Sequence, residues 1–233
     1  MSRGWNDRRT LAFKDIKDMN SPWRSVLSLA RHTKWAKGEY VRLGRDLLFL
    51  ERGSVRLAHQ SMDGAEKVLW YIREGCIFGE SAFFDPVPEE NYCICMTPCS
   101  VYAFSPTSVK QISVEQPELL LNLYQSMGRK LKILSYQASS LCLDSVLVRI
   151  CKFLSQRIVP GSSPLAADIG MPQQEMASLL GVHRISLYRV LRQQEEGGLF
   201  GPIQGNIITI LRPHDFYVLA GMRCEQSRAS EPI

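Results

Sequence analysis

The chain has 233 residues, 45% of them hydrophobic and 22% charged, with a formal net charge of +5. This composition is typical of a globular protein with two domains of ordinary size, and no apolar run approaches the roughly 20 residues that span a bilayer. The opening stretch, MSRGWNDRRTLAFKD, is too polar for a secretory signal, so we expect a cytoplasmic protein with no membrane partner. The modest positive charge is compatible with an anionic partner but does not establish one.

The cysteine pattern does not indicate a disulfide scaffold. Seven cysteines are an odd number without the spacing of such scaffolds, so we expect reduced thiols. Cys93 and Cys95 would share one face of a strand, and Cys99 follows shortly after, which leaves a redox function open. Cysteine is also a common small core residue, and a strand pair rarely assembles four metal ligands. We expect no metal site, and the four histidines are not at the spacing that a cupin-like metal enzyme would need.

The segment from residue 21 to residue 104 predicts a short helix followed by many strands. Ser21-Pro22 is a helix start, with Ser as N-cap and Pro at the first helical position. From Trp35 to Phe104, short apolar runs such as LLFLERGSVRL and KVLWYI alternate with glycines. Turns at this spacing predict a compact antiparallel sandwich or barrel.

From Pro117 the apolar period changes to that of a long helix. Its apolar residues are separated alternately by four and three positions: Leu120, Tyr124, Met127, Leu131, Leu134, Ala138 and Leu141. Such a heptad seam predicts a parallel dimer interface, although so short a seam can instead pack on its own sheet. Leu143-Asp144-Ser145 then interrupts the pattern and provides an N-cap for a further helix, VLVRICKFLSQRI. We therefore expect a hinge between two domains near Asp144.

The stretch from Gln173 to Phe200 has the steric pattern of a helix-turn-helix. Ala177 is small where a second helix would cross, and Gly181 permits a tight turn. Apolar residues stand where the two helices must pack on each other: Met176, Leu180, Val182, Leu187 and Val190. The alternative is an ordinary helical hairpin with solvated arginines.

The second helix of this motif would expose side chains suited to the major groove of DNA. Arg184 and Arg189 are the candidates for paired bonds to guanine, and Ile185 is the candidate for contact with a thymine methyl. The other candidate DNA-binding residues lie at helix starts, where phosphates bind, or on the exposed face: Gln173, Gln174, His183, Ser186 and Tyr188.

A wing is expected after the second helix. The run GLFGPIQGNIITILRP holds two extended segments around Gln204-Gly205-Asn206, residues that tolerate positive φ in a hairpin turn. Residues 171–200 carry three Arg against three Glu, so other cations must add to the attraction for DNA. The candidates for this contribution are Arg149, Lys152, Arg157 and Arg212.

Together these features resemble the CRP/FNR family of bacterial transcription regulators, from about Trp35 to Ala220. The resemblance rests on KGEYV, GCIFGESAFF, the long central helix and, most specifically, the helix-turn-helix with its wing. It implies an α+β fold whose residues 1–116 form an N-terminal helix and an antiparallel β-roll, a jelly-roll-like double-stranded β-helix. It further implies a central dimerisation helix in 117–143, a winged helix-turn-helix in 144–221 and a disordered tail in 222–233.

The same resemblance implies a homodimer that is not an enzyme. Its winged helices would read near-palindromic double-stranded DNA about 34 Å apart, and RNA polymerase would be a further partner if the protein is an activator. Its β-roll would bind a small effector through residues of the roll and of the central helix: Phe78, Gly79, Glu80, Ser81, Leu131, Leu134 and Ser135. The effector, the target genes and the choice between activation and repression stay open.

Departures from the family pattern bear on the effector. Members that bind cyclic AMP carry Glu, then Arg-Ser, then Thr-Ser on the central helix. Here Glu80 matches the first position, but Glu89-Glu90-Asn91 and Leu134-Ser135 occupy the others. A phosphate facing two carboxylates is strongly repelled in a partly buried site, so we do not expect cyclic AMP. Residues 1–75 contain no cysteine for an N-terminal iron–sulfur cluster, whereas heme stays open because one Cys or His on the roll would suffice as an axial ligand.

The reading helix also departs from the family. Ile185 stands where Glu is common, His183 where Ser is usual, and Tyr188 where a small residue is usual. We therefore expect a DNA site that differs from the best-known consensus and has a thymine opposite Ile185. The alternative function is a ligand- or heme-binding sensor module that acts through protein contacts without specific DNA binding.

Overall fold

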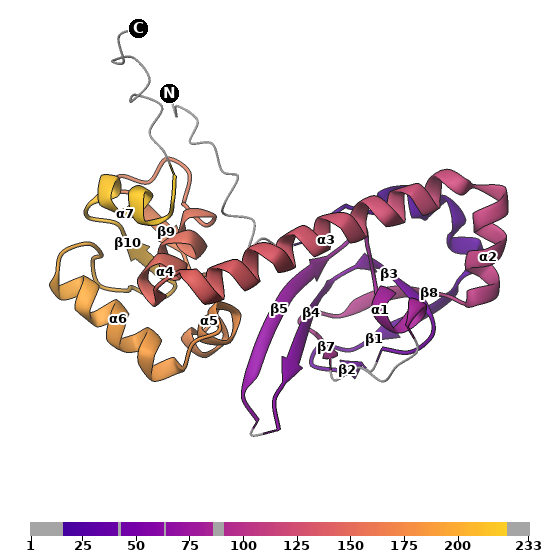
Figure 1. The fold of residues 1–233 in the computed structure, drawn as a ribbon, viewed down its shortest axis with the longest axis horizontal. Helices are drawn as coiled ribbons and strands as arrows, with labels where there is room; N and C mark the ends of the chain where they lie inside the picture. The colour runs from indigo at the N-terminus through magenta and orange to yellow at the C-terminus, as the bar shows by residue number, and fades with distance from the viewer. Residues whose placement is uncertain (1–15, 42, 63, 86–90, 223–233) are drawn as a thin grey trace, which may run out of the picture. The chain divides into compact units, whose positions relative to one another are not determined.

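The computed structural model describes residues 16–41, 43–62, 64–85 and 91–222. The chain forms two compact units, divided within helix α3 (Pro117–Leu143): residues 15–134 form the first, and residues 135–222 belong to the second (Figure 1). The domain boundaries expected after residues 116 and 143 stay a prediction. Glu89, Glu90 and nearly all of the expected tail lie outside the described residues.

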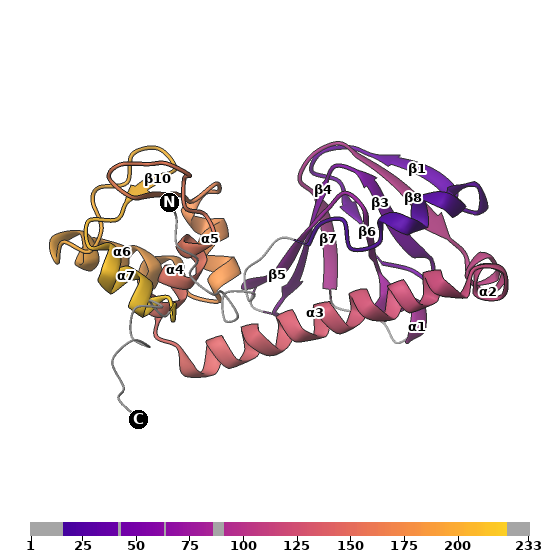
Figure 2. The ribbon, with the colours of Figure 1, turned by 90° about the horizontal axis from the view of Figure 1, so that it is seen from above.

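The first unit is built on two four-stranded sheets (Figure 2). One sheet has the strand order β1-β8-β3-β6, formed by Arg31–Trp35, Cys99–Phe104, Leu47–Arg52 and Cys76–Phe78. The other has the order β2-β7-β4-β5, formed by Tyr40–Val41, Asn91–Cys95, Ser54–Gln60 and Glu66–Arg73. The strand pairs in both sheets are antiparallel. The expected β-roll of an α+β fold is therefore confirmed.

Strand β3 explains why this unit has two hydrophobic cores. Its run LLFL is fully buried, and the alternation of a strand sends Leu48 and Leu50 to one face and Leu47 and Phe49 to the other. The first face packs between the two sheets, and the second packs against helices η2 (Ser21–Leu29), α2 (Pro106–Glu115) and α3. Each such side chain contributes about 1.5–3 kcal/mol when fully buried, so the sheet is stabilised from both sides.

The cysteines of the first unit are core residues. Cys76, Cys93, Cys95 and Cys99 are buried between the sheets, and the described cysteines carry free thiols. Burial raises the pKa of Cys95 to about 12 and that of Cys76 to about 11, so both thiols are protonated at neutral pH. Within the described ranges, no group of three or more His, Cys, Asp or Glu side chains is arranged to hold a metal ion.

The N-terminal helix η2 (Ser21–Leu29) begins differently from the prediction. It is a 3-10 helix whose N-cap is Asn20, so the prediction of Ser21 as N-cap was wrong. The side chain of Asn20 makes no cap bond, because it is drawn into the core. Its Nδ2 donates to Ser126 Oγ at 3.0 Å, and its Oδ1 accepts from the backbone N–H of Ile77 at 3.0 Å. One buried amide therefore joins η2, β6 and α3.

Helix α2 (Pro106–Glu115) and helix α3 follow strand β8 in the chain. Ser105 caps α2 by accepting from the backbone N–H of Ser108 at 3.1 Å. The buried side of α3 has the same four-three spacing as the predicted seam, but it is displaced by one residue: Leu119, Leu123, Ser126, Lys130, Ile133, Gln137 and Ser140. The predicted seam therefore lies on the neighbouring face of the helix.

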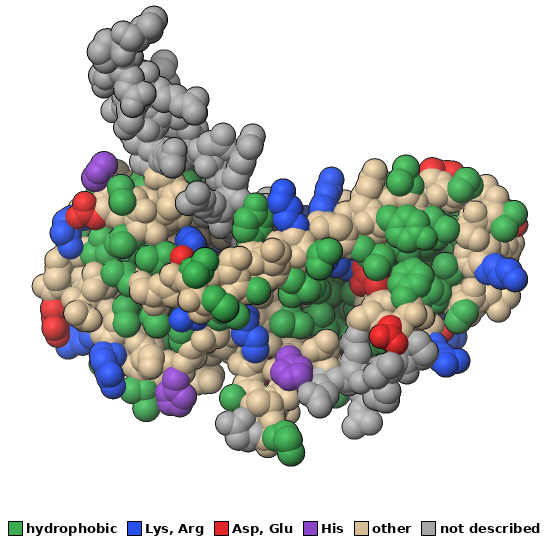
Figure 3. All heavy atoms as spheres, in the orientation of Figure 1, with side chains coloured by type: hydrophobic (Ala, Val, Ile, Leu, Met, Phe, Trp, Pro, Cys, Tyr) green, Lys and Arg blue, Asp and Glu red, His purple; other side chains and the backbone are tan. Residues whose placement is uncertain are grey.

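Seam residues differ in how much of their surface meets solvent. Leu120, Met127 and Leu134 are partly buried against the two cores. Tyr124 and Leu131 remain 58% and 69% exposed, and Ala138 and Leu141 are exposed as well. In the space-filling view, hydrophobic side chains gather on the surface over α3 (Figure 3).

A buried ion pair joins α3 to the corner between β6 and α1 (Glu80–Phe84). Gly79 makes this corner with a φ of 83°, which places Glu80 at the start of α1. Lys130 Nζ bonds the carboxylate of Glu80 and the carbonyl oxygen of Ile77, the latter at 2.6 Å. Only 9% of Glu80 and 5% of Lys130 is exposed, so the pair is held away from water.

The second unit is mostly helical. Its elements are α4 (Val146–Ser155), β9 (Ala166–Asp168), α5 (Gln173–Leu180), α6 (Arg184–Glu196), β10 (Ile207–Thr209) and α7 (Pro213–Leu219). Ser145 caps α4 as predicted, accepting from the backbone N–H of Val148 at 3.3 Å. The helix ends at Ser155 rather than at Ile158. Among the described helices, none is long and apolar enough to cross a membrane.

We predict that Glu80→Gln and Lys130→Met each lower the free energy of unfolding by about 3 kcal/mol, because each leaves the other charge buried without a partner. Chemical denaturation of the full chain measures the effect. The double variant should recover a large part of the loss, since it removes both charges. Arg31→Met, which breaks the exposed Arg31–Asp46 pair, is the control and should change stability by less than about 1 kcal/mol. Single variants as stable as this control would contradict the prediction.

Candidate functional site

Helices α5 and α6 form the predicted helix-turn-helix. The turn is made by Gly181, whose φ of 63° lies in the left-handed region that favours glycine. The backbone N–H of Val182 bonds the carbonyl of Ala177 at 3.0 Å and closes the turn. The apolar residues predicted at the crossing are buried or half-buried: Met176, Ala177, Leu180, Val182, Leu187 and Val190. The sequence pattern therefore predicted this motif correctly.

A buried arginine from α4 holds the end of α5. Arg149 Nη1 donates to the carbonyl oxygens of Leu180 at 2.7 Å and Gly181 at 3.2 Å. These carbonyls lack helical partners and carry the negative end of the helix dipole, so a guanidinium group suits them. Burial lowers the pKa of Arg149 from its usual value. Because its side chain is buried and committed to this turn, Arg149 is not available to bond a phosphate directly, and its contribution to the attraction for DNA stays a prediction.

The other cations that we expected to add to the attraction for DNA also make contacts within their own unit. Lys152 pairs with Asp144, whose carboxylate also accepts from Ser140 Oγ at 2.5 Å. The guanidinium of Arg157 lies over the ring of Phe153, 4.5 Å from its centroid. Asp144 therefore ties the last turn of α3 to α4, at the position where the sequence predicted a hinge.

Arg212 braces the loop after α6. Its side chain donates to the carbonyl oxygens of Gly197 at 3.1 Å and Gly198 at 3.2 Å, and it pairs with Asp215 at 3.1 Å. Unlike Arg149, it remains largely exposed. It can therefore add to the positive potential of this surface while it supports the loop.

The exposed side of α6 carries most of the predicted DNA-binding residues. His183 is the N-cap, and its Nδ1 accepts from the backbone N–H of Ile185 at 3.4 Å. Ile185 and Tyr188, on the same side of the helix, are 60% and 54% exposed. The remaining candidates are exposed or half-exposed at the starts of α5 and α6 and along α6: Gln173, Gln174, Arg184, Ser186 and Arg189.

The arginines of α6 are not equivalent. Arg192 pairs with Glu195 at 3.4 Å, one turn further along the helix. Arg184 and Arg189 are exposed, and neither has a hydrogen bond or ion pair within residues 91–222. Their guanidinium donors are therefore available to a ligand outside the unit.

A small hairpin lies beside α6. Strands β9 and β10 pair antiparallel, and Gln204 and Ile207 exchange backbone hydrogen bonds of 2.9 and 3.0 Å across Gly205-Asn206. Gly205 has a φ of 61°, as the predicted hairpin turn requires. A cavity of about 250 Å³ lies between α6 and this hairpin, lined among others by Tyr188, Arg192 and Ile203. The predicted wing is therefore present on the face that carries the exposed side chains of α6.

Comparisons with known proteins now decide the family. Residues 36–115 match the cyclic nucleotide-binding domain family, and residues 148–216 match the Crp-like helix-turn-helix domain family. The chain belongs to the CRP/FNR family of bacterial transcription regulators. The cAMP-activated global transcriptional regulator CRP of Haemophilus influenzae is 26% identical over 175 residues, which are 72% of this chain and 78% of that protein. Vfr of Pseudomonas aeruginosa, also cAMP-activated, is 26% identical over 160 residues, 66% of this chain and 75% of Vfr.

Solved structures share this fold. CprK in complex with OCPA matches with a TM-score of 0.71 at 17% identity, over 88% of this chain and 99% of CprK. The c-di-GMP responsive regulator CLP of Xanthomonas campestris matches with a TM-score of 0.71 at 23% identity, over 81% of this chain and 97% of CLP. The protein is thus a transcription regulator with a helix-turn-helix DNA-binding domain, in a family of regulators rather than enzymes.

The predicted effector residues of this CRP/FNR protein lie at the corner of Glu80 and on α3. Phe78 is a core residue, and the carboxylate of Glu80 is taken by Lys130. Gly79 and Ser81 flank Glu80 at the same corner, whereas Leu131 and Ser135 are exposed on α3 and Leu134 is partly buried. The sequence analysis did not predict a role for Lys130. Its position could have indicated one, because Lys130 falls in the same four-three spacing as the buried Leu123 and Ile133 and so faces inward.

We predict that Arg149→Met lowers the free energy of unfolding of the second unit by about 1–3 kcal/mol, because it removes the donor from the buried carbonyl of Leu180 and the part-buried carbonyl of Gly181. Denaturation of the full chain and hydrogen exchange at the end of α5 measure the effect. Arg192→Met removes an exposed arginine of α6 and should stay within about 0.5 kcal/mol of the parent. Equal stability of the two variants would show that the Arg149 contacts are dispensable.

Proposed function

We propose that this regulator is a homodimer that binds near-palindromic double-stranded DNA in the cytoplasm under the control of a small effector. The observation that carries the proposal is the pair of exposed arginines on α6 next to the wing, Arg184 and Arg189, which have no hydrogen bond or ion pair with the described residues of their unit. The alternative, a sensor module without specific DNA binding, is not favoured. It would leave these guanidinium groups and the exposed Ile185 without a use.

The proposed reading surface is the exposed side of α6 in the major groove. Arg184 and Arg189 would each bond guanine O6 and N7, and Ile185 would contact a thymine methyl one turn before Arg189. His183, Gln173 and the free N–H groups at the helix starts would hold phosphates and set the register, with help from the remaining candidates: Gln174, Ser186 and Tyr188. If the protein activates transcription, RNA polymerase is its further partner.

The proposed dimer interface is the seam on α3. Tyr124, Leu131 and Leu141 expose 40% or more of their surface, although the neighbouring face of the same helix is buried. Covering such side chains with a second α3 removes apolar surface from water and packs the heptads as in a coiled coil. Two-fold symmetry would then place the two reading helices about 34 Å apart on DNA.

The proposed effector is not cyclic AMP, although the CRP and Vfr relatives are activated by it. In this chain the carboxylate of Glu80, which would meet the ribose, is bonded to Lys130 instead. Leu134-Ser135 replaces the Thr-Ser pair that meets the purine in cyclic AMP-binding members. Breaking a buried ion pair to admit a nucleotide would leave a buried charge without its partner.

We predict that Arg184→Ala and Arg189→Ala each weaken binding to the preferred DNA by about 1–3 kcal/mol and change binding to random DNA little. The preferred site is first selected from random duplexes with the parent protein. Fluorescence anisotropy over a range of salt concentrations then measures affinity for both DNAs. Arg192→Ala, which removes the same charge from the same helix, should cause a smaller and sequence-independent loss. Equal losses on both DNAs for Arg184→Ala and Arg189→Ala would show that they contact only phosphate.

We predict that Leu131→Glu raises the dimer dissociation constant about 100-fold or more, because it places a pair of carboxylates in the apolar seam. Sedimentation equilibrium measures the assembly, and circular dichroism checks that the variant is folded. Gln125→Glu adds the same charge to an exposed position of α3 outside the seam and should leave the dimer intact. A folded Leu131→Glu variant that dimerises like the parent would place the interface elsewhere.

A further inference from the structure

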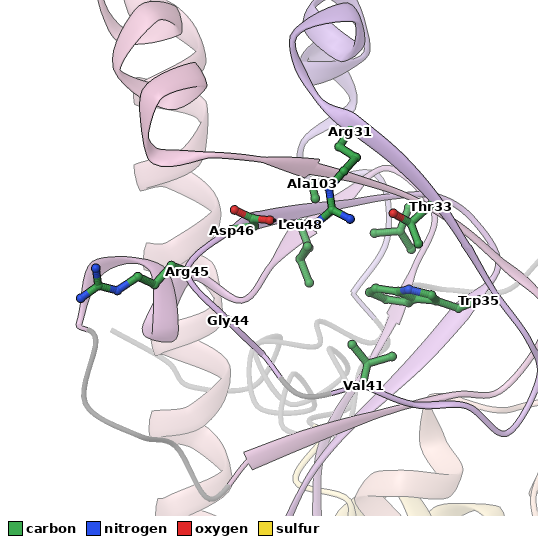
Figure 4. A pocket seen from close by; sticks show the side chains of 10 residues that line it. Arg31, Thr33, Trp35, Val41, Gly44, Arg45, Asp46, Leu48 and Ala103 are labelled. Atoms are coloured by element: carbon green, nitrogen blue, oxygen red, sulfur yellow. Dashed lines mark hydrogen bonds and ion pairs between the residues drawn. The ribbon is translucent and has the colours of Figure 1, made fainter.

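A cavity of about 300 Å³ opens into the β-roll at a place other than the predicted effector site. It lies between strands β1, β3 and β8 and the connection from β2 to β3 (Figure 4). Its walls are apolar and its rim is polar, formed by Trp35, Val41, Leu48, Val101 and Ala103 and by Arg31, Thr33, Gly44, Arg45 and Asp46. None of the seven predicted effector residues is among these described lining residues. This volume lies at the small end of the range of small-molecule sites.

The rim of the cavity carries one cation and one anion that face each other. Arg31 Nη2 lies 3.3 Å from Asp46 Oδ2, with the hydroxyl of Thr33 on the same side. Figure 4 shows Arg31, Asp46 and Thr33 at one end, Trp35 and Val41 at the other, and the side chain of Arg45 directed away. The side chains of Arg31 and Asp46 are 72% and 36% exposed, so water screens the pair and a ligand can replace it at little cost.

This distribution of charge selects among ligand classes. A carboxylate alone would be attracted by Arg31 but repelled by Asp46. An amine alone would be attracted by Asp46 but repelled by Arg31. A zwitterion with adjacent ammonium and carboxylate groups satisfies both side chains at once. The apolar walls around Trp35 require that the rest of the ligand be apolar, and the volume limits it to about the size of one side chain.

We propose that this cavity binds an apolar α-amino acid as the effector, an inference that rests on the proposed effector-controlled regulator. The carboxylate of the amino acid bonds Arg31 and Thr33, its ammonium group bonds Asp46, and its side chain packs on Trp35, Val41 and Leu48. On binding, Arg31 and Asp46 lose part of their contact with each other, and each gains an oppositely charged group of the ligand. Neither side chain is therefore left without a partner.

A chain of contacts leads from the cavity to α3. The ring of Trp35 meets the ring of Phe78 edge to face, with centroids 6.3 Å apart. Phe78 ends strand β6, and the next two residues are Gly79 and Glu80, whose carboxylate holds Lys130 of α3. An amino acid packed on Trp35 therefore acts on the element that orients α3. It shifts DNA affinity only if it binds the two arrangements of this corner with different affinity.

Calorimetry of the full-length protein with three matched compounds tests the ligand class. L-Phenylalanine has both charges, 3-phenylpropanoate lacks the ammonium group, and 2-phenylethylamine lacks the carboxylate. We expect L-phenylalanine or the smaller L-leucine to bind, and each singly charged compound to bind about tenfold or more weakly than L-phenylalanine. Absence of binding by both amino acids at millimolar concentration would overturn the proposal. Binding of 3-phenylpropanoate as tight as that of L-phenylalanine would overturn it as well.

Two charge variants test the geometry of the rim. Arg31→Gln and Asp46→Asn should each weaken L-phenylalanine about tenfold, and Asp46→Asn should also strengthen 3-phenylpropanoate because it removes the repelling carboxylate. Arg45→Gln, on the same rim but directed away, should bind L-phenylalanine like the parent. Equal affinities for all three variants would locate any binding outside this cavity.

DNA binding of the same samples separates this inference from the proposed function. A regulator that binds its selected DNA but no amino acid refutes only the inference. A protein that binds L-phenylalanine but no specific DNA under any condition refutes the proposed function and leaves the cavity assignment standing as a binding site.

Discussion

Helix α3 has to satisfy two packing demands on adjacent faces, and the rest of the molecule depends on how it does so. Its buried face places Lys130 on Glu80 and Ser126 on Asn20, contacts that need one particular rotation of the helix. The face one residue further on keeps Leu131 in water. A rotation that buried the seam would strip Lys130 of its partner, so the ion pair favours the rotation in which the seam stays exposed.

The second unit divides its basic residues between the interior and the surface. Arg149 is buried and compensates the carbonyl end of α5, while Arg184 and Arg189 stand in solvent on α6. Without a cation inside the turn, the end of α5 would keep unsatisfied carbonyls next to Gly181, and the start of the reading helix would lose its support. The same residue type therefore supports this surface from within and is exposed on it, and the local net charge does not tell which arginine is buried and which is exposed.

Most of the elements could be predicted from the chain because they follow local periods and turn sterics. The run LLFL, the four-three spacing of α3, and the small residues Ala177 and Gly181 depend only on near neighbours. The features that the sequence did not predict depend instead on partners that are distant in the chain. Ser21 is not the N-cap of η2, because Asn20 holds that position, and the sequence did not indicate that α4 turns Arg149 inward toward α5.

The sequence by itself determined the order of strands and helices, the turn at Gly181 and the exposed set on α6, since side chains within one or two turns of each other dictate these features. Only the tertiary structure decided which of two adjacent faces of α3 is buried, and that Lys130 neutralises Glu80 from 50 residues away. It alone also placed a cavity beside the Arg31–Asp46 pair. The reason is physical: a periodic pattern states which residues of a helix or strand share a face, whereas the partner of that face is set by packing between segments distant in the chain.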